Sequence, residues 1–296
     1  MEGYHPGDPG LDLLTQFRGQ SPMTAPGRHA ALFKTVPLDL SGMTQLVHGA
    51  LIHEYAAGQY GVDIPPERTS EKHLRRLEEM LDRLLALDGR PLAEQRSPNR
   101  RLAGVCRHFS VMLVALLRHA GIPARARCGF GSYFHFGSYE DHWVAEYWRP
   151  EESRWVMVDA QLDDTWRAML QPDFDPMDVP HDRFIVAGDA WVRCRTGASD
   201  PNRFGIFDKR GLWFVAGNVL RDLASVSGME MLPWDSWGPM PDPQTPITDE
   251  QLALFDRIAA ARRSPAAEAV ALYERDERLR VPPRVFNAVL DRVETV

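Results

Sequence analysis

The chain has 296 residues, enough to bury the core of one large domain. It carries 34 Lys and Arg against 41 Asp and Glu, a formal net charge of -7 at pH 7, which is the opposite of the basic balance typical of nucleic-acid binding. The longest apolar run, residues 111–117, is far shorter than the about 20 residues that cross a bilayer, so the sequence contains no candidate membrane span.

The first forty residues are rich in glycine, proline and polar side chains, and we expect them to form an irregular arm. Because they lack the basic start and apolar middle of a secretion signal, we expect a cytoplasmic protein with no membrane or nucleic-acid partner. Helical spacing begins in residues 42–58, and a stronger helix is predicted over residues 70–89. Its apolar stripe consists of Leu74, Leu77, Met80, Leu81, Leu84 and Leu85.

Residues 101–161 indicate one helix followed by three strands. The helix, residues 106–121, is almost continuously apolar and should therefore be buried, and Gly121 and Pro123 end it. The strands are predicted from their aromatic and β-branched content at residues 124–131, 142–148 and 154–160.

The rest of the chain is predicted to be mainly helical after a polar, proline-rich loop at residues 171–182. Helical patterns return at residues 212–226, 249–263, 266–279 and 283–294. The predicted fold class is therefore α+β, with a buried, cysteine-bearing helix packed on a small antiparallel sheet and extra helices at both ends.

The three cysteines, Cys106, Cys128 and Cys194, are odd in number and widely spaced, which argues against a disulfide framework and a structural zinc site. Cys106 follows Gly104 and Val105 at the predicted start of the buried helix. There, unpaired backbone N–H groups and the positive end of the helix dipole favour a thiolate, the reactive form of cysteine. The same N–H groups can bind the oxyanion of a tetrahedral intermediate.

A nucleophilic thiol also needs a base within hydrogen-bonding reach and a third group that orients the base. If the second and third predicted strands form a hairpin with Trp148 opposite Ser153, counting along both strands places His142 opposite Asp159. Their Cβ atoms would then lie about 4.5–5.5 Å apart on one face of the sheet. A register shift of one residue would send the two side chains to opposite faces.

Four pieces of the segment 101–161 resemble the transglutaminase-like superfamily, whose members share a papain-like arrangement of Cys, His and Asp. They occur in the same order as in that family. They are the Gly-x-Cys helix start at residues 104–106, the LRxxGIPAR turn at residues 117–125, His142 with Glu146 four residues later, and Trp155 followed by Asp159.

The resemblance implies that Cys106 is the nucleophile, His142 the base and Asp159 the orienting group. We expect a catalytic domain of this type over residues 41–240, with insertions, between the N-terminal arm of residues 1–40 and a C-terminal helical extension over residues 241–296. Chemistry through an acyl-enzyme on Cys106 requires no cofactor or metal. Its substrate would be a peptide, a small amide or a thioester, including a carrier-bound one.

The sequence departs from the family in ways that bear on the activity. Trp143 directly follows His142, and Ala160 replaces a common proline. No tryptophan precedes residue 143, whereas protein-crosslinking transglutaminases have one upstream of the cysteine. This difference argues against protein crosslinking and leaves hydrolysis or transfer to an amine.

Further residues are candidates for substrate binding or for stabilising the oxyanion. Asn99 is a candidate second oxyanion donor, His135 lies in an aromatic loop before the predicted His strand, and Trp143 follows the predicted base. Trp234 and Trp237 form either a packing plug or a cover for the active site. Two alternatives to an enzyme stay open, namely an interaction module on the same fold and a zinc site built from the Cys, His and Asp.

Overall fold

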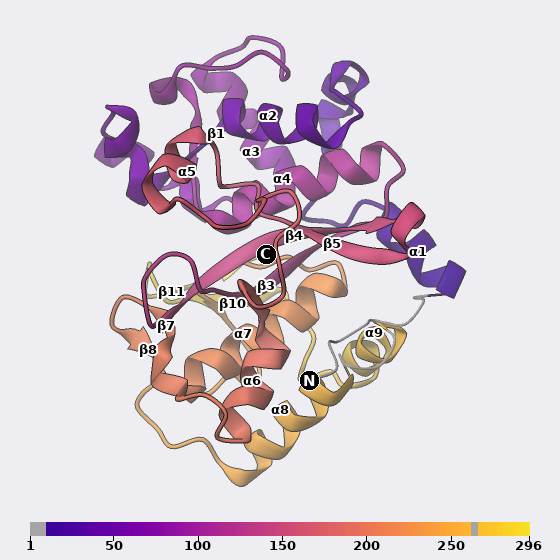
Figure 1. The fold of residues 1–296 in the computed structure, drawn as a ribbon, viewed down its shortest axis with the longest axis vertical. Coiled ribbons are helices and arrows are strands. Elements are labelled where there is room, and N and C mark those ends of the chain that lie inside the picture. The colour runs from indigo at the N-terminus through magenta and orange to yellow at the C-terminus, as the bar shows by residue number, and fades with distance from the viewer. Residues whose placement is uncertain (1–9, 262–265) are drawn as a thin grey trace.

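A six-stranded sheet separates two groups of helices in residues 10–261 and 266–296, which are the part of the chain that the computed structural model describes (Figure 1). Its strands are β3 (Ala124–Gly131), β4 (Tyr139–Arg149), β5 (Arg154–Val158), β6 (Phe184–Val186), β7 (Phe204–Ile206) and β8 (Lys209–Arg210). The order is β6-β3-β4-β7-β8 with β5 also paired to β4, and the β4–β7 pair is parallel while the others are antiparallel. The α+β prediction is confirmed.

Helices cover both faces of this sheet. The α-helices of the described residues are α1 (Gly10–Arg18), α2 (Leu40–Ala50), α3 (Leu77–Leu87), α4 (Cys106–His119), α5 (Asp164–Leu170), α6 (Ala187–Arg195), α7 (Leu212–Val226), α8 (Asp249–Ala261) and α9 (Ala266–Arg275). Helix α4 packs against β3 and β4 from the side of α2, whereas α6 and α7 pack against β3 from the side of α8 (Figure 1). Within the described residues, no helix combines the length and apolar character needed to cross a bilayer.

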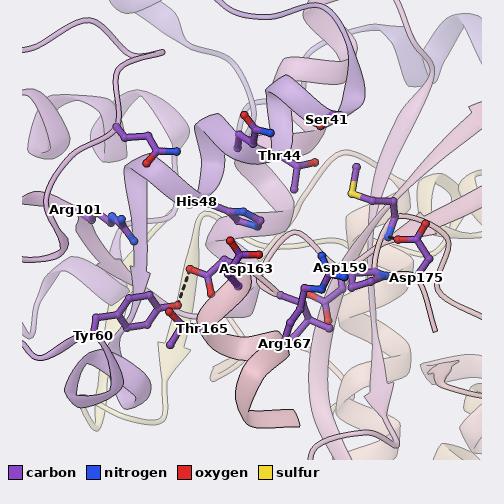
Figure 2. A pocket seen from close by; sticks show the side chains of 16 residues that line it. Ser41, Thr44, His48, Tyr60, Arg101, Asp159, Asp163, Thr165, Arg167 and Asp175 are labelled. Atoms are coloured by element: carbon purple, nitrogen blue, oxygen red, sulfur yellow. Dashed lines mark hydrogen bonds between the residues drawn. The ribbon is translucent and has the colours of Figure 1, made fainter. Parts of the chain in front are cut away.

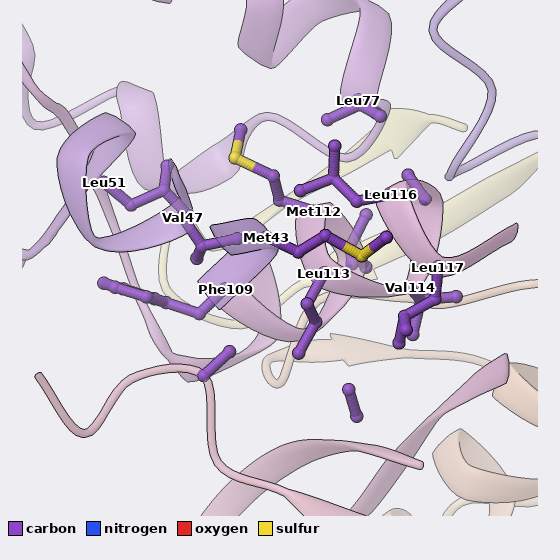
Figure 3. Close-up of a cluster of buried hydrophobic side chains, with 14 of the residues drawn as sticks. Met43, Val47, Leu51, Leu77, Phe109, Met112, Leu113, Val114, Leu116 and Leu117 are labelled. Atoms are coloured by element: carbon purple, nitrogen blue, oxygen red, sulfur yellow. The ribbon is translucent and has the colours of Figure 1, made fainter. Parts of the chain in front are cut away.

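Helix α4 is buried along nearly its whole length, as its continuous apolar sequence predicts. Figure 3 shows why: Leu113 and Leu117 pack in one cluster with Met43 and Val47 of α2. Each such side chain contributes about 1.5–3 kcal/mol when it is buried. The helix ends at the predicted place because Gly121 adopts a φ of 76° and the N–H of the following residue bonds back to the carbonyl of Leu117.

The N-terminal expectations need two corrections. Residues 1–9 of the predicted irregular arm lie outside the described residues, but Gly10–Arg18 is a helix, and Phe17 packs edge-on against Trp155 at 5.5 Å. The segment 42–58 is not one helix, because α2 ends at Ala50 and the chain continues as strand β1 (Leu51–His53). This strand pairs in parallel with β2 (Leu102–Gly104), a long-range contact that local helical spacing does not reveal.

The last predicted helix, residues 283–294, is instead an antiparallel hairpin of β10 (Arg284–Asn287) and β11 (Arg292–Thr295). Strand β10 also pairs with β9 (Asp235–Ser236). Val285 and Asn287 are buried while the residues beside them are exposed, which is the period of a half-buried strand. The predicted helical extension therefore holds α8, α9 and this hairpin.

The β4–β5 hairpin has a register two residues away from the predicted one. Trp148 lies opposite Trp155 rather than Ser153, because Ser153 adopts a φ of 50° and belongs to the turn. A shift of two residues keeps the alternation of side chains. His142 and Asp159 therefore stay on the same side of the hairpin, but as diagonal neighbours, with Asp159 just beyond the end of β5.

Candidate active site

Three residues that are far apart in the sequence meet beside the start of α4. Nε2 of His142, on β4, lies 2.8 Å from Oδ2 of Asp159, and Cys106 is near enough to the same imidazole to contribute to its raised pKa. Since Asp159 occupies Nε2, Nδ1 is the nitrogen left for the sulfur. This is the geometry of a nucleophile, a base and a group that orients the base.

All three side chains are shielded from water. Cys106 is 7% exposed, His142 2% and Asp159 1%. Oδ1 of Asp159 also accepts the backbone N–H of Gln161 at 3.0 Å, so both carboxylate oxygens have partners. The carboxylate is thus held in one orientation, and it holds the imidazole in turn.

The environment of His142 favours the charged ring. Burial disfavours the imidazolium, but the charge and hydrogen bond of Asp159, together with Cys106, outweigh burial and raise the pKa of His142 to about 10. The ring is therefore protonated at neutral pH. An imidazolium in this position can give its proton to a leaving group.

The backbone before Cys106 explains why the helix starts there. His108 accepts the N–H of Val105 through Nδ1 at 3.2 Å and so caps α4. Gly104 permits this cap, because a Cβ at that position would lie 2.9 Å from Cβ and Cγ of His108. Burial lowers the pKa of His108 to about 3. Because its Nδ1 accepts the N–H of Val105, His108 has a structural role in the helix cap and is not the catalytic base.

Tyr133 is a site residue that the sequence interpretation missed. Its hydroxyl donates a 2.6 Å hydrogen bond to Oδ2 of Asp159. Burial, followed by the nearby carboxylate, raises the pKa of Tyr133 well above its ordinary value, so the hydroxyl stays a donor. The sequence did contain a signal for Tyr133, because this residue lies in the same aromatic loop as the candidate His135.

The other three candidates do not join this group. Asn99 is exposed, and its side-chain oxygen accepts from Ser97 at 2.8 Å. His135 is exposed at the loop tip. Trp143 is fully buried, and it packs in the core opposite Cys128, its partner on β3. Alternation along β4 directs Trp143 away from the side that His142 occupies.

A polar cavity of about 670 Å³ lies next to Asp159, but neither Cys106 nor His142 lines it (Figure 2). Tyr60 donates a 2.8 Å hydrogen bond to Asp163 at its wall. Its lining mixes carboxylates with cationic side chains, namely Asp159, Asp163, Asp164, Asp175, Arg101 and Arg167. Carboxylates thus outnumber guanidinium groups four to two in this lining.

The other two cysteines and Trp237 lie in environments typical of packing residues. Cys128 is fully buried, and burial raises the pKa of Cys194 to about 11. Trp237 is buried, and its indole N–H donates to the carbonyl of Leu279, as expected for a packing residue. Among the described residues, no cluster of three or more His, Cys, Asp or Glu side chains is arranged to hold a metal ion.

The part of the chain that builds this site falls within a match to a known family. Residues 66–160 match the family model of the transglutaminase-like superfamily. Protein-glutamine gamma-glutamyltransferase of Pseudomonas aeruginosa is 35% identical over 65 residues, which make up 19% of this chain and 10% of that protein. The matched segment thus spans about a tenth of that relative's length. No solved structure matches the chain significantly.

Proposed function

The chain carries a domain of the transglutaminase-like superfamily, and on this premise we propose that it catalyses acyl transfer or hydrolysis through a covalent intermediate on Cys106. The observation that carries the proposal is the position of His142, which bonds to Asp159 at 2.8 Å and lies near enough to Cys106 for that residue to help raise its pKa. No single residue of the three makes this case alone.

The first half of the reaction forms the acyl-enzyme. The sulfur of Cys106 attacks the carbonyl carbon of an amide, ester or thioester, and the carbonyl oxygen takes the negative charge. Backbone N–H groups at the start of α4 are the donors best placed to stabilise that oxyanion. His142 then gives its proton to the leaving amine, alcohol or thiol as the carbon–heteroatom bond breaks.

The second half releases the acyl group. Neutral His142 takes a proton from water or an amine, whose oxygen or nitrogen attacks the thioester carbon and expels the sulfur of Cys106. Water gives hydrolysis and an amine gives a new amide. Asp159 keeps the imidazole oriented through both halves and balances its charge.

The substrate we propose is a peptide, a small amide or a thioester, including a carrier-bound one, and the reaction is assigned to the cytoplasm. The name of the Pseudomonas relative refers to transfer from a glutamine amide, which supports an amide as one acyl donor. The absence of a tryptophan before Trp143 favours a small acceptor over protein crosslinking.

Alkylation followed by intact mass tests the proposal. Iodoacetamide at pH 6.5 should label Cys106 on the order of tenfold faster than it labels N-acetylcysteine, because a free thiol is mostly protonated there. Cys106→Ala should remove this labelling and all acyl transfer, while the matched variant Cys194→Ala should keep both. His142→Ala should retain the thiol and lose the rate advantage.

Labelling of Cys106 at the rate of N-acetylcysteine, with no change in His142→Ala, would contradict an enzymatic role. That outcome would favour the non-enzymatic interaction module. Stoichiometric zinc in protein purified without added metal, lost in Cys106→Ala, would instead favour a metal site.

A further inference from the structure

One side of helix α2 forms a wall of the polar cavity beside Asp159 (Figure 2). Ser41, Thr44, Gln45 and His48 line the cavity, and their spacing places them on one face of the helix. The loop after β5 and helix α5 supply another wall, which is also polar. The volume of about 670 Å³ lies within the range of about 300–1,000 Å³ that is typical of pockets for small ligands.

His48 brings a buried polar atom without a partner to this wall. Its Nε2 is shielded from water and has no hydrogen bond to the part of the chain that the structure describes. Burial lowers the pKa of His48, although the charge of Asp163 opposes the shift, so the ring is mostly uncharged at neutral pH. A buried polar atom without a partner lowers stability, and a ligand that reaches this nitrogen would satisfy it.

The two guanidinium groups of the lining have no counter-ion. Nε of Arg101 donates to the carbonyl of Arg96 at 3.0 Å, which leaves the two terminal nitrogens of Arg101 available. Within the described residues, neither Arg101 nor Arg167 is in an ion pair, whereas the buried Arg125 pairs with a carboxylate at 2.6 Å. A half-buried guanidinium without a carboxylate partner is a binding group for the carboxylate of a ligand.

Two of the four carboxylates of the lining are already engaged. Both oxygens of Asp159 accept hydrogen bonds, and those of Asp163 accept the hydroxyl of Tyr60 at 2.8 Å and a backbone N–H at 3.1 Å. Asp164 and Asp175 are exposed and form no ion pair with any described residue. Two guanidinium groups and two carboxylates are therefore left for a ligand, which favours a ligand that carries both signs of charge.

We propose that this cavity binds a short peptide with free ends, whose carboxylate bonds to Arg101 and whose ammonium group lies near Asp164 and Asp175. In the view of Figure 2, Arg101 and Asp175 lie on opposite sides of His48, so the two charged ends of one ligand can lie at different ends of the cavity. The amide groups between those ends would meet the polar face of α2, including Nε2 of His48.

Calorimetric titration with triglycine and two capped derivatives tests the charge pattern. N-acetyltriglycine lacks the ammonium group and triglycinamide lacks the carboxylate, while both keep the peptide backbone. Triglycine should bind about tenfold more tightly than either derivative, because each capped peptide loses one charged contact. Equal affinity for the three peptides, or no binding of triglycine, would overturn the proposal.

Substitutions in the lining test the two ends of the peptide. Arg101→Gln should weaken triglycine binding about tenfold and leave triglycinamide binding unchanged. The double variant Asp164→Asn, Asp175→Asn should also weaken triglycine binding, but should leave N-acetyltriglycine binding unchanged. Arg100→Gln and Asp182→Asn, at exposed positions outside the lining, are the matched controls and should bind all three peptides like the unmodified protein.

Thermal unfolding without peptide shows which variants are folded, and the comparison of the three peptides on the unmodified protein needs no variant. Unchanged triglycine binding in a folded Arg101→Gln protein would contradict the proposed contact.

The same titration separates this site from the proposed catalytic centre. Neither Cys106 nor His142 lines the cavity, so the inference does not rest on the proposed function. Cys106→Ala should bind triglycine as the unmodified protein does, although it loses acyl transfer. Loss of triglycine binding in Cys106→Ala would place the peptide at the nucleophile and overturn a separate site. Failure of the alkylation test alone would leave the peptide site standing.

Discussion

Tyr133 and His142 share one oxygen atom of Asp159: the tyrosine hydroxyl lies 2.6 Å from Oδ2 and the imidazole nitrogen 2.8 Å from it. Two donors on one carboxylate oxygen fix its position more tightly than one does. They also divide its negative charge. Tyr133 is thus a positioning residue that acts on the base through Asp159.

Tyr133→Phe should therefore change the pH profile as well as the rate. Without the hydroxyl, the carboxylate charge is less stabilised by its own partners and pairs more strongly with the imidazolium, so the pKa of His142 should rise. We expect kcat to fall about tenfold and the alkaline limb of kcat to move to higher pH. A pH–rate profile beside Tyr139→Phe, a control remote from Asp159, checks this, and an unmoved alkaline limb in Tyr133→Phe would refute the shared-oxygen role.

The raised pKa of His142 also predicts how stability depends on pH. The pKa of His142 rises from 6.5 to about 10 on folding. The charged ring therefore contributes to the free energy of unfolding fully below pH 6.5, and this contribution is lost as the pH rises through about 10. Urea unfolding should show the largest loss of unfolding free energy in His142→Gln, relative to the unmodified protein, at pH 6. This loss should be smaller at pH 10. His135→Gln, at an exposed site, should show no such trend. A gap that widens with pH would mean that the ring is buried uncharged.

Glu146 holds two buried arginines in the sheet next to the site. Burial disfavours the carboxylate, but Arg125 at 2.6 Å and Arg127 at 2.7 Å outweigh it and lower the pKa of Glu146 from 4.5 to about 2. The stability that the charged carboxylate of Glu146 provides is present above pH 4.5 and is lost as the pH falls through about 2. Glu146→Gln should destabilise the fold by about 3–5 kcal/mol at pH 7, because the buried carboxylate that Arg125 and Arg127 share loses its charge, while the contact of Arg127 with Asp222 at 3.2 Å remains.

Chemical denaturation at pH 7 and at pH 3 checks the role of Glu146. The loss of unfolding free energy in Glu146→Gln should be smaller at pH 3 than at pH 7. The exposed control Glu151→Gln should lose little unfolding free energy at either pH. Equal costs for the two variants would show that the buried ion pairs contribute nothing to stability.

Gly104 should tolerate no side chain. The Cβ of an alanine would lie 2.9 Å from the ring base of His108, so the cap of α4 and the backbone beside Cys106 must shift. We expect Gly104→Ala to cost about 1–3 kcal/mol of stability and to lower kcat more than KM. Gly58→Ala has no atom within 4 Å of the new Cβ and is the matched control. Thermal unfolding and steady-state kinetics on both variants measure the difference, and equal behaviour of the two would contradict the close contact.

Prediction from sequence succeeded where a local pattern determines the structure. The apolar run at residues 111–117 predicts a helix that is buried on all sides, and α4 is such a helix. The pairing of β4 with β5 was predicted with a register error of two residues, and His142 still meets Asp159 because the side-chain period of a strand is two.

Prediction failed where distant segments decide the outcome. Local spacing suggested a helix through Leu51–His53, but the chain there pairs with Leu102–Gly104. Asn99 and Trp143 were chosen for their residue type and their nearness in sequence, and neither criterion tells which way a side chain points.

Sequence alone determined which residues can carry the chemistry, because the start of a helix and the alternation of a hairpin are set by contacts between near neighbours. The tertiary structure alone decided what surrounds them, such as Tyr133 on Asp159 and Phe134 beside His142. Those neighbours come from loops and helices whose relative positions depend on packing across the whole domain, and no local periodicity encodes such contacts.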